Sequence, residues 1–360
     1  MAAVRADGGR HPHGTPPARR DTRPGRQAAT RPPGALVVAV LVLALALTAA
    51  CGTVGNQLPQ QALPLPDAAT ATAAAGTSTG TGTRTGGAPA PADCGDPRAS
   101  LRPPAVLPAP GAMPAGSHLR AIADRGHLTV GVLADVPPFG YIDPLSGEFA
   151  GFDVEIARLI GRAIFGADDH VRFRAVTYAE RIPVLLDGTV DLVVATMTTN
   201  CERRAKVDFS AVYYEETNRI LVLAKSPYRS LADLGGRRVC AAAGTTSIEH
   251  VERADPRPVA VAVPTIGDCL VALQAGTVDG ISTAEAVLSG LAAQDPRVAI
   301  VGPRFDSEPD AIAVSRDHPE LTRFVNGVLE RTLADGTWRG LARDWLTGIE
   351  PVIPVPRYRD

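Results

Sequence analysis

The chain has 360 residues, enough for about two domains or one two-lobed unit. Hydrophobic residues make up 45% and charged residues 21%, which excludes a wholly disordered, collagen-like or coiled-coil chain. The formal net charge of −2 gives no basic surface that would indicate nucleic-acid binding. Every Phe, Tyr and Trp lies between Phe139 and Tyr358, so we expect the globular part to begin near residue 118.

Residues 1–50 have the pattern of an export signal. Residues 1–34 are polar and rich in Arg, residues 35–50 are apolar and uncharged, and Cys51 follows at once. The apolar run of 16 residues is shorter than the roughly 18 that a transmembrane anchor needs. The segment Leu47-Thr48-Ala49-Ala50-Cys51 resembles a bacterial lipobox. This resemblance implies that Cys51 is lipidated and anchors the protein to the extracytoplasmic face of the cell membrane.

A low-complexity segment follows the lipidation site. Residues 51–117 are rich in Ala, Pro, Gly and Thr, with the run TSTGTGTRTGG at 77–87. Such a composition cannot bury enough apolar surface to order itself. We therefore predict a disordered tether over this segment.

Strand and helix patterns alternate from residue 127, which is typical of an α/β fold with a mostly parallel sheet. In the first half the patterns predict strands at 127–135, 171–178, 189–198 and 219–225, and helices at 152–166 and 179–188. Asp153 is the expected cap of the first of these helices and Gly166 its end.

The second half repeats this alternation. Strands are expected at 236–244, 258–264, 277–283, 297–303 and 310–316, and helices at 245–254, 267–276, 284–293, 319–336 and 337–346. LLDGTVDLVVAT (185–196) and LQAGTVDGIST (273–283) also resemble each other, which favours two similarly built lobes.

Four segments in order resemble the family 3 extracellular solute-binding proteins, the polar amino-acid receptors of ABC importers. They are VGVLADVPPFGYIDPLSGEFAGFDVEIARLIG (130–161), RIPVLLDGTVDLVVATMTTNCERRAKVDFS (181–210), SLADLGGRRVCAAAGTTS (230–247) and ADGTWRGLARDWL (334–346). The motifs TNCER, VCAAAGTTS and DCLVALQAG are most similar to actinobacterial glutamine/glutamate-binding lipoproteins.

The resemblance implies a two-lobed periplasmic-binding-protein-like fold (type II) whose lobes are joined by two hinge crossings. It implies lobe 1 at 118–217 and 307–346, lobe 2 at 218–306, and a Pro-rich tail at 347–360. A polar amino acid of the glutamate, glutamine or aspartate type would bind between the lobes and be delivered to an ABC permease. We expect a monomer with no cofactor, no metal and no catalytic residues.

A free amino acid presents a carboxylate and an ammonium, and burying either group without a partner is costly. Arg203 is the candidate for the carboxylate, because its planar guanidinium matches that group and the family uses the corresponding Arg in this way. Thr198, Thr196 and Ala195 would add a hydroxyl and backbone groups. A surface ion pair is the alternative role for Arg203.

Further candidates follow from position in the chain. Thr245 and Thr246 start a helix after a strand, where free N–H groups favour an anion, although Thr245 could simply cap the helix. Arg181 matches an Arg that glutamate- and aspartate-type members use toward the ligand side chain. Phe139, Tyr141 and Tyr178 could wall the pocket or belong to the core.

One position departs from the family pattern. The family usually has Asp at the position of Ala284, where it holds the ammonium of the ligand. The neighbouring Glu285 is the first candidate to replace it, and Asp135 in lobe 1 is the second.

Four cysteines follow Cys51. An even number of cysteines in an exported chain favours disulfides over buried free thiols. Their spacing fits no zinc site. Four cysteines allow three pairings, and we favour Cys240–Cys269 because both lie in lobe 2. Cys94–Cys201 then remains and would fasten the tether to lobe 1.

Two other functions are compatible with these residues. A tethered binding lobe could report its ligand to a membrane partner instead of supplying a transporter. An enzyme on the same fold, such as a lyase similar to cyclohexadienyl dehydratase, would need a pocket carboxylate as general acid or base, and Glu285 and Asp135 are the candidates.

Overall fold

The computed structural model describes residues 94–349 and 351–360, all of which belong to one compact unit. The predicted export signal, Cys51 and most of the predicted tether lie outside these residues. None of the helices in the described part is long and apolar enough to cross a membrane.

An eight-stranded sheet in the order β5-β1-β6-β11-β7-β10-β8-β9 runs through the unit. Its strands are β1 (Leu128–Val132), β5 (Val171–Ala175), β6 (Leu192–Val193), β7 (Asp208–Leu223), β8 (Arg238–Ala242), β9 (Val259–Val263), β10 (Gly280–Ala284) and β11 (Val298–Val314). A small separate sheet contains β2 (Asp135–Val136), β3 (Gly140–Ile142) and β4 (Phe149–Ala150).

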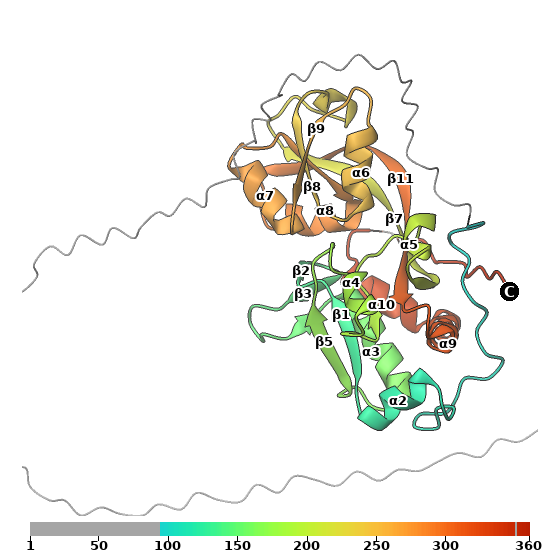
Figure 1. Ribbon diagram of the computed structural model, residues 1–360. Coiled ribbons are helices and arrows are strands. Elements are labelled where there is room, and N and C mark those ends of the chain that lie inside the picture. The colour runs from blue at the N-terminus through green and yellow to red at the C-terminus, as the bar shows by residue number, and fades with distance from the viewer. Residues whose placement is uncertain (1–93, 350) are drawn as a thin grey trace, which may run out of the picture. The chain divides into compact units, whose positions relative to one another are not determined.

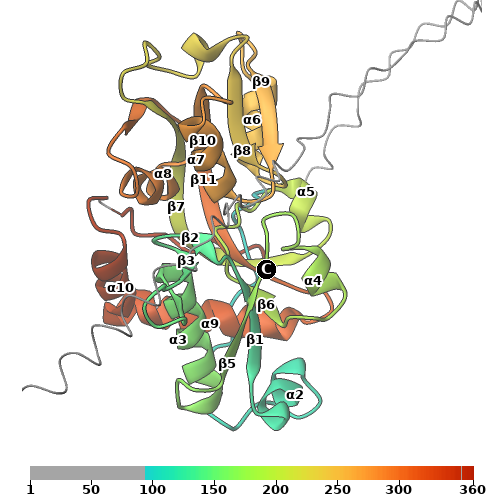
Figure 2. The same ribbon diagram turned by 90° about the vertical axis from the view of Figure 1, so that its left-hand side faces the viewer.

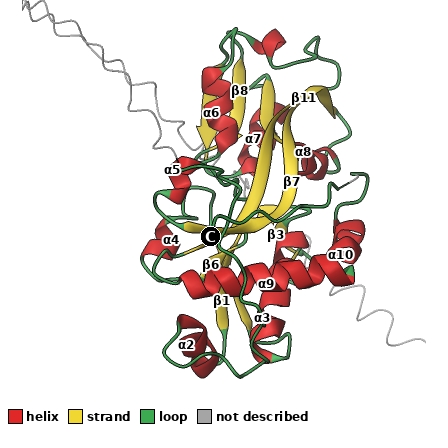
Figure 3. Ribbon diagram, turned by 90° about the vertical axis from the view of Figure 1, so that its right-hand side faces the viewer, coloured by secondary structure: helices red, strands yellow, loops and turns green. Residues whose placement is uncertain are grey.

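The sheet has two parallel halves joined by an antiparallel pair. Strands β1, β5 and β6 are parallel in what we call lobe 1, and β8, β9 and β10 are parallel in lobe 2. Strands β7 and β11, of 16 and 17 residues, pair antiparallel from Asp208 and Val314 to Leu223 and Val298 (Figure 3). These two strands carry the chain from one lobe to the other.

Helices cover both lobes (Figures 1 and 2). Lobe 1 carries α2 (His118–Arg125), α3 (Phe152–Phe165), α4 (Pro183–Leu186), α5 (Cys201–Arg204), α9 (Pro319–Asp335) and α10 (Thr337–Trp345). Lobe 2 carries the 3₁₀ turn η1 (Ala232–Leu234) and helices α6 (Thr246–Arg253), α7 (Ile266–Gln274) and α8 (Glu285–Ala292).

The alternating α/β order is confirmed, but some predicted bounds are wrong. The strands expected at 297–303 and 310–316 are one strand, β11, which is irregular between Val301 and Ala313. The helix expected at 152–166 forms, yet its cap is Gly151, and Asp153 is buried instead. Asp153 accepts hydrogen bonds from the Tyr213 hydroxyl and the Thr196 amide, so it links α3 to β7 and to the end of β6.

Residues 94–117, which the composition predicts as part of the tether, pack on lobe 1. Ser100 is buried, bridges to Tyr358 in the C-terminal tail and donates its hydroxyl hydrogen to the carbonyl of Phe209. Asn326 of α9 donates to Ser100 Oγ and to the Leu101 carbonyl. These polar contacts, together with the buried Met113 and the packed Leu107, hold the segment on lobe 1. Its path along lobe 1 can be followed in Figure 1.

Candidate functional site

A small cavity lies between the lobes, at the centre of the long strand pair. Residues of lobe 1, of lobe 2 and of β7 and β11 line it: Tyr178, Arg181, Thr196, Thr198, Arg203, Glu216, Asn218, Thr245, Thr246, Ser247, Thr283, Ala284, Val287, Glu308 and Asp310. Seven of these are predicted site residues: Tyr178, Arg181, Thr196, Thr198, Arg203, Thr245 and Thr246. The structure therefore brings together most of the residues that the motifs indicated.

Arg203 reaches the cavity from the short helix α5. Asn200 caps this helix, because its side chain accepts a hydrogen bond from the Arg203 amide at 2.9 Å. The guanidinium donates to the carbonyls of Thr198 at 2.6 Å and Gly244 at 3.1 Å. Burial lowers the pKa of Arg203, and among residues 94–349 and 351–360 no carboxylate forms an ion pair with it. A buried guanidinium bonded to neutral carbonyls favours an added anion.

Arg181 is held mainly by backbone carbonyls. It donates to Tyr178, to the Ala195 and Thr196 carbonyls, and to Gly244 across the interlobe space. Its guanidinium also lies 4.8 Å from the centre of the Tyr178 ring, and burial lowers its pKa to about 9. With most of its donors used, Arg181 fixes the loop at the end of β6. The Ala195 carbonyl serves as its acceptor.

The start of α6 forms the lobe 2 wall. Thr245 caps this helix by accepting from the Ile248 amide at 3.3 Å, and its hydroxyl donates to the Ala242 carbonyl at 2.7 Å. The Thr246 hydroxyl donates to Glu308 Oε2 at 2.7 Å. The capping role considered for Thr245 is confirmed, and Thr246 is the member of the pair that contacts a carboxylate.

Glu308 of β11 connects the two walls. Its Oε2 also accepts from the Thr198 hydroxyl of lobe 1, and its Oε1 accepts from Asn218 Nδ2 at 2.6 Å. One carboxylate thus satisfies hydroxyls from both lobes, and together with the two arginine bonds to Gly244 it holds the lobes closed.

Two further carboxylates, Glu216 of β7 and Asp310 of β11, line the same cavity. Their exposed fractions are 7% and 1%. Sequence reasoning missed both, together with Glu308, Asn218 and Ser247. The available signal was their position on the two strands that cross between the lobes, where the family places its cleft.

Four predicted ligand residues are not among those that line the cavity: Ala195, whose carbonyl binds Arg181, and Phe139, Tyr141 and Glu285. Phe139 is a core residue packed against Phe152 and Tyr214, and Tyr141 packs against Trp345. Glu285 pairs with Arg219 at 2.7 Å and with Arg304. Burial alone would raise the pKa of Glu285, but the hydrogen bonds from Arg304 and Arg219 outweigh burial and lower it. Glu285 is outside the residues that line the cavity, because the first turn of α8 directs it toward the two arginines.

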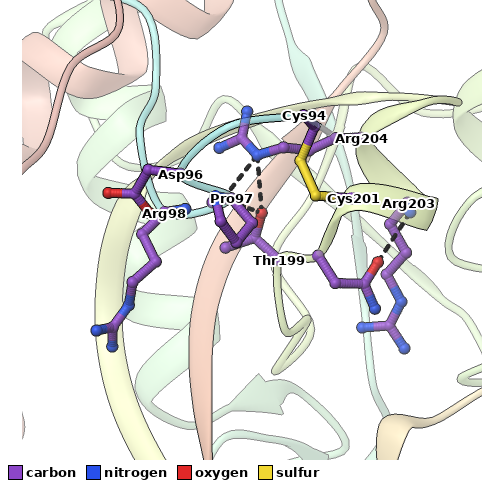
Figure 4. Close-up of a disulfide and its surroundings, with 9 residues drawn as sticks. Cys94, Asp96, Pro97, Arg98, Thr199, Cys201, Arg203 and Arg204 are labelled. Atoms are coloured by element: carbon purple, nitrogen blue, oxygen red, sulfur yellow. Dashed lines mark hydrogen bonds between the residues drawn. A yellow bond between two sulfur atoms is a disulfide. The ribbon is translucent and has the colours of Figure 1, made fainter. Parts of the chain in front are cut away.

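Both predicted disulfides are present. Cys240–Cys269 joins β8 to α7, and Cys94–Cys201 joins the N-terminal segment to the first residue of α5. Arg204 of the same helix donates to the Pro97 carbonyl at 2.7 Å and to Thr199 Oγ1 at 3.2 Å (Figure 4). The helix that carries Arg203 is therefore fastened to the segment that precedes the folded lobes.

The described His, Cys, Asp and Glu residues form no group that could hold a metal ion. The cavity instead combines buried guanidinium donors, threonine hydroxyls and carboxylates. Such a set can recognise both charges of a zwitterion.

Comparison with known proteins decides the family. Residues 128–348 match the profile of the bacterial extracellular solute-binding proteins, family 3. The chain belongs to this family. It is 34% identical to the ABC transporter glutamine-binding protein GlnH of Bacillus subtilis (strain 168) over 229 residues, 63% of this chain and 84% of the relative. It is 30% identical to the glutamate-binding protein GluB of Corynebacterium glutamicum over 251 residues, 66% of this chain and 84% of the relative.

Solved structures agree with this membership. An ancestral arginine-binding protein bound to arginine is 34% identical, with a TM-score of 0.57 over 61% of this chain and 98% of its own. The ancestral amino acid-binding protein AncCDT-1, a precursor of cyclohexadienyl dehydratase, is 30% identical, with a TM-score of 0.59 over 64% of this chain and 100% of its own. The two-lobed α/β fold is therefore the fold of amino-acid-binding proteins.

Proposed function

We propose that this protein is a lipid-anchored receptor that captures a polar amino acid of the glutamate, glutamine or aspartate type and delivers it to an ABC permease. The observation that carries the proposal is the arrangement of Arg203 and Thr198 opposite Gly244, Thr245 and Thr246 across one interlobe cavity. The α-carboxylate of the ligand would accept hydrogen bonds from Arg203 and from the threonines, in place of the carbonyls that Arg203 now contacts.

The names of the relatives support this class of ligand. The proteins of B. subtilis and C. glutamicum are named for glutamine and glutamate. The lipid anchor is supported by the apolar run at 35–50 followed by Cys51. Delivery to a permease is supported by membership of the family.

Thermal unfolding of the full chain in detergent with each of the twenty amino acids tests the proposal. A ligand at 100 times its dissociation constant stabilises a protein by about 2.7 kcal/mol, a shift of roughly 5–10 °C for a domain of this size. We expect such a shift with at least one polar amino acid and its loss in Arg203→Gln.

The matched control is Arg343→Gln, on the exposed face of α10, which should keep the full shift. If none of the twenty amino acids shifts the transition of the wild-type protein, the receptor function is wrong.

A further inference from the structure

Three carboxylates share one face of the strands that cross between the lobes. In the pairing of β7 with β11, Glu308 is opposite Glu216, and Asp310 is opposite Tyr214, two residues further along the strand. Because side chains alternate along a strand, Glu216, Glu308 and Asp310 point to the same side, and all three line the cavity. Like charges at neighbouring cross-strand positions destabilise a sheet unless a cation compensates them.

Both carboxylate oxygens of Glu308 have hydrogen-bond donors, whereas one oxygen of Glu216 and one of Asp310 have none among the described residues. Glu308 accepts from Thr198, Thr246 and Asn218. Glu216 Oε2 and Asp310 Oδ2 are buried and find no hydrogen-bond donor among the described residues. Both carboxyl groups are buried at neighbouring cross-strand positions, and burial together with their proximity raises both pKa values, so that one of them keeps a proton. Without a ligand, this proton takes the place of a missing cation.

The nearby arginines do not supply that cation. Arg181 directs its guanidinium to four backbone carbonyls, and Arg203 directs its own to two. Neither forms an ion pair with Glu216 or Asp310 within the part of the chain that the structure describes. The arginines and the unpaired carboxylates therefore present opposite charges to the same cavity.

The carboxylate pair lines the same cavity as Ala284, the position at which the family usually has an aspartate. Ala284 ends β10 and stands at the cap position of α8, where its methyl group offers no hydrogen-bond acceptor. Glu216 lines this cavity, and the backbone amide of Ala286, in the first turn of α8, acts to lower the pKa of Glu216 against the larger effect of burial. Glu216 thus provides from β7 the acceptor that an aspartate at position 284 would provide from the helix itself.

We propose that Glu216 and Asp310 together hold the ammonium group of the ligand, in place of the aspartate usual at position 284. This inference rests on the proposed function, and it assigns the ammonium to the crossing strands and the carboxylate to Arg203. On binding, the ammonium displaces the shared proton to solvent, and both carboxyl groups become ionised acceptors. Glu285, held by Arg219 and Arg304, takes no part.

Titration calorimetry on the full chain in detergent tests this assignment with four probes. L-glutamine carries both groups, and glutaramate is the same molecule without the ammonium. L-arginine and agmatine form the second pair, in which agmatine lacks the carboxylate. The variants are Glu216→Gln and Asp310→Asn, which remove charge while keeping shape. Glu215→Gln is the matched control, since Glu215 is the adjacent residue on β7 and pairs with Arg98 on the opposite face.

We expect the wild-type protein to bind an amino acid, and each variant to weaken that binding about 10–100-fold, as the loss of a charge-assisted hydrogen bond does. The preference of the wild-type protein for L-glutamine over glutaramate should fall by the same factor, a change that general loosening of the fold would not produce. Glu215→Gln should bind within about threefold of the wild-type protein.

The contrary results are distinct. If the wild-type protein binds an amino acid and both variants keep its preference for the ammonium-bearing probe, or if only Glu285→Gln abolishes that preference, this assignment is wrong. If the wild-type protein binds agmatine but no amino acid, and Asp310→Asn abolishes that binding, the receptor function fails while the cation site stands. If it binds no probe and no amino acid, both proposals fail.

Discussion

Glu216 and Asp310 store a proton that the unfolded chain would release. Burial raises the pKa of Glu216 to about 8, and burial together with the charge of Glu216 raises the pKa of Asp310. The charged and titratable groups that surround the pair are Asp153 on α3, Glu308 on β11, Arg181, Arg203 on α5, and the hydroxyls of Tyr178, Tyr213 and Tyr214. Desolvation of carboxylates outweighs the attraction of the arginines at this place in the fold.

This stored proton gives a predicted pH dependence. The folded protein keeps it up to about pH 8, whereas an unfolded Glu loses it near 4.5. The stabilising contribution is therefore complete below about pH 4.5 and is lost as the pH rises to 8. We expect the free energy of unfolding of the unliganded protein to fall by about 1 kcal/mol per pH unit between pH 6 and 8.

Urea unfolding at pH 6, 7 and 8 measures this slope. Glu216→Gln should flatten it, and Glu215→Gln should leave it unchanged. The range above pH 6 is chosen because Asp153, with a pKa raised by burial to about 6, contributes mainly below it. Equal slopes in the wild-type protein and Glu216→Gln would contradict the shared proton.

The residues at the site differ in how well the sequence predicts them. Arg203, Thr198 and Thr246 lie in motifs of fixed local spacing, so the resemblance located them correctly in the cavity. Glu216 and Asp310 meet only through the non-local pairing of β7 with β11, which no local pattern reveals. Glu285 was predicted because it follows Ala284 in the sequence. Adjacent residues of a helix point in different directions, so Glu285 does not point into the cavity.

At the scale of elements, the closed position of the lobes depends on close backbone contacts. Gly290 of α8 lies so near lobe 1 that a Cβ there would be 1.9 Å from the carbonyl oxygen of Pro137. Gly244 has a φ of +76° and lies against Ala179, where a Cβ would be 3.0 Å from its Cα. Neither neighbour is a flexible side chain, so added bulk must push the lobes apart.

Gly290→Ala should therefore weaken ligand binding without weakening the fold. Alanine favours a helix over glycine by about 1 kcal/mol, so the unfolding free energy of the unliganded protein should stay the same or rise. Affinity for L-glutamine should fall about tenfold or more, because the closed state becomes less populated.

Calorimetry measures the affinity for L-glutamine, and urea unfolding measures the free energy of unfolding. The control is Gly340→Ala in α10, where a Cβ meets no atom within 4 Å, and which should leave affinity unchanged. A Gly290→Ala protein with wild-type affinity would show that ligand binding does not require this approach of α8 to lobe 1.

Element prediction succeeded where contacts are local and failed at the crossing strands. The helix at 152–166 follows from its apolar spacing and forms at Phe152–Phe165. The prediction placed two strands at 297–303 and 310–316, with residues 304–309 between them. Pairing with β7 carries strand β11 through residues 304–309 by way of register shifts.

At the scale of the whole molecule, the N-terminal segment is part of the binding lobe. The disulfide Cys94–Cys201 closes a separation of 107 residues and ends on the helix that presents Arg203. Arg98 adds an ion pair to Glu215 on β7, on the face of the strand opposite the cavity. The composition of the segment did not predict this, because its order comes from a covalent bond, polar contacts and a few individual apolar side chains such as Met113 and Leu107.

Replacing both cysteines, Cys94→Ser with Cys201→Ser, should cost about 2–5 kcal/mol of unfolding free energy. It should also lower affinity for L-glutamine several-fold, because α5 loses an attachment. The control is the pair Cys240→Ser with Cys269→Ser, which removes a disulfide of lobe 2 at a comparable stability cost. Urea unfolding first establishes the stability of both double variants, and calorimetry then measures their affinity for L-glutamine. Equal affinity in the two would show that the attachment of the N-terminal segment does not affect ligand binding.

The two ends of the described chain lie together on lobe 1. Ser100 bridges to Tyr358, and Asp360 pairs with Arg323 of α9. A fluorophore attached near residue 94 or near residue 360 would therefore travel with lobe 1 and report nothing about closure. An optical sensor built on this scaffold needs its second label on lobe 2, for example at the exposed Val271 of α7.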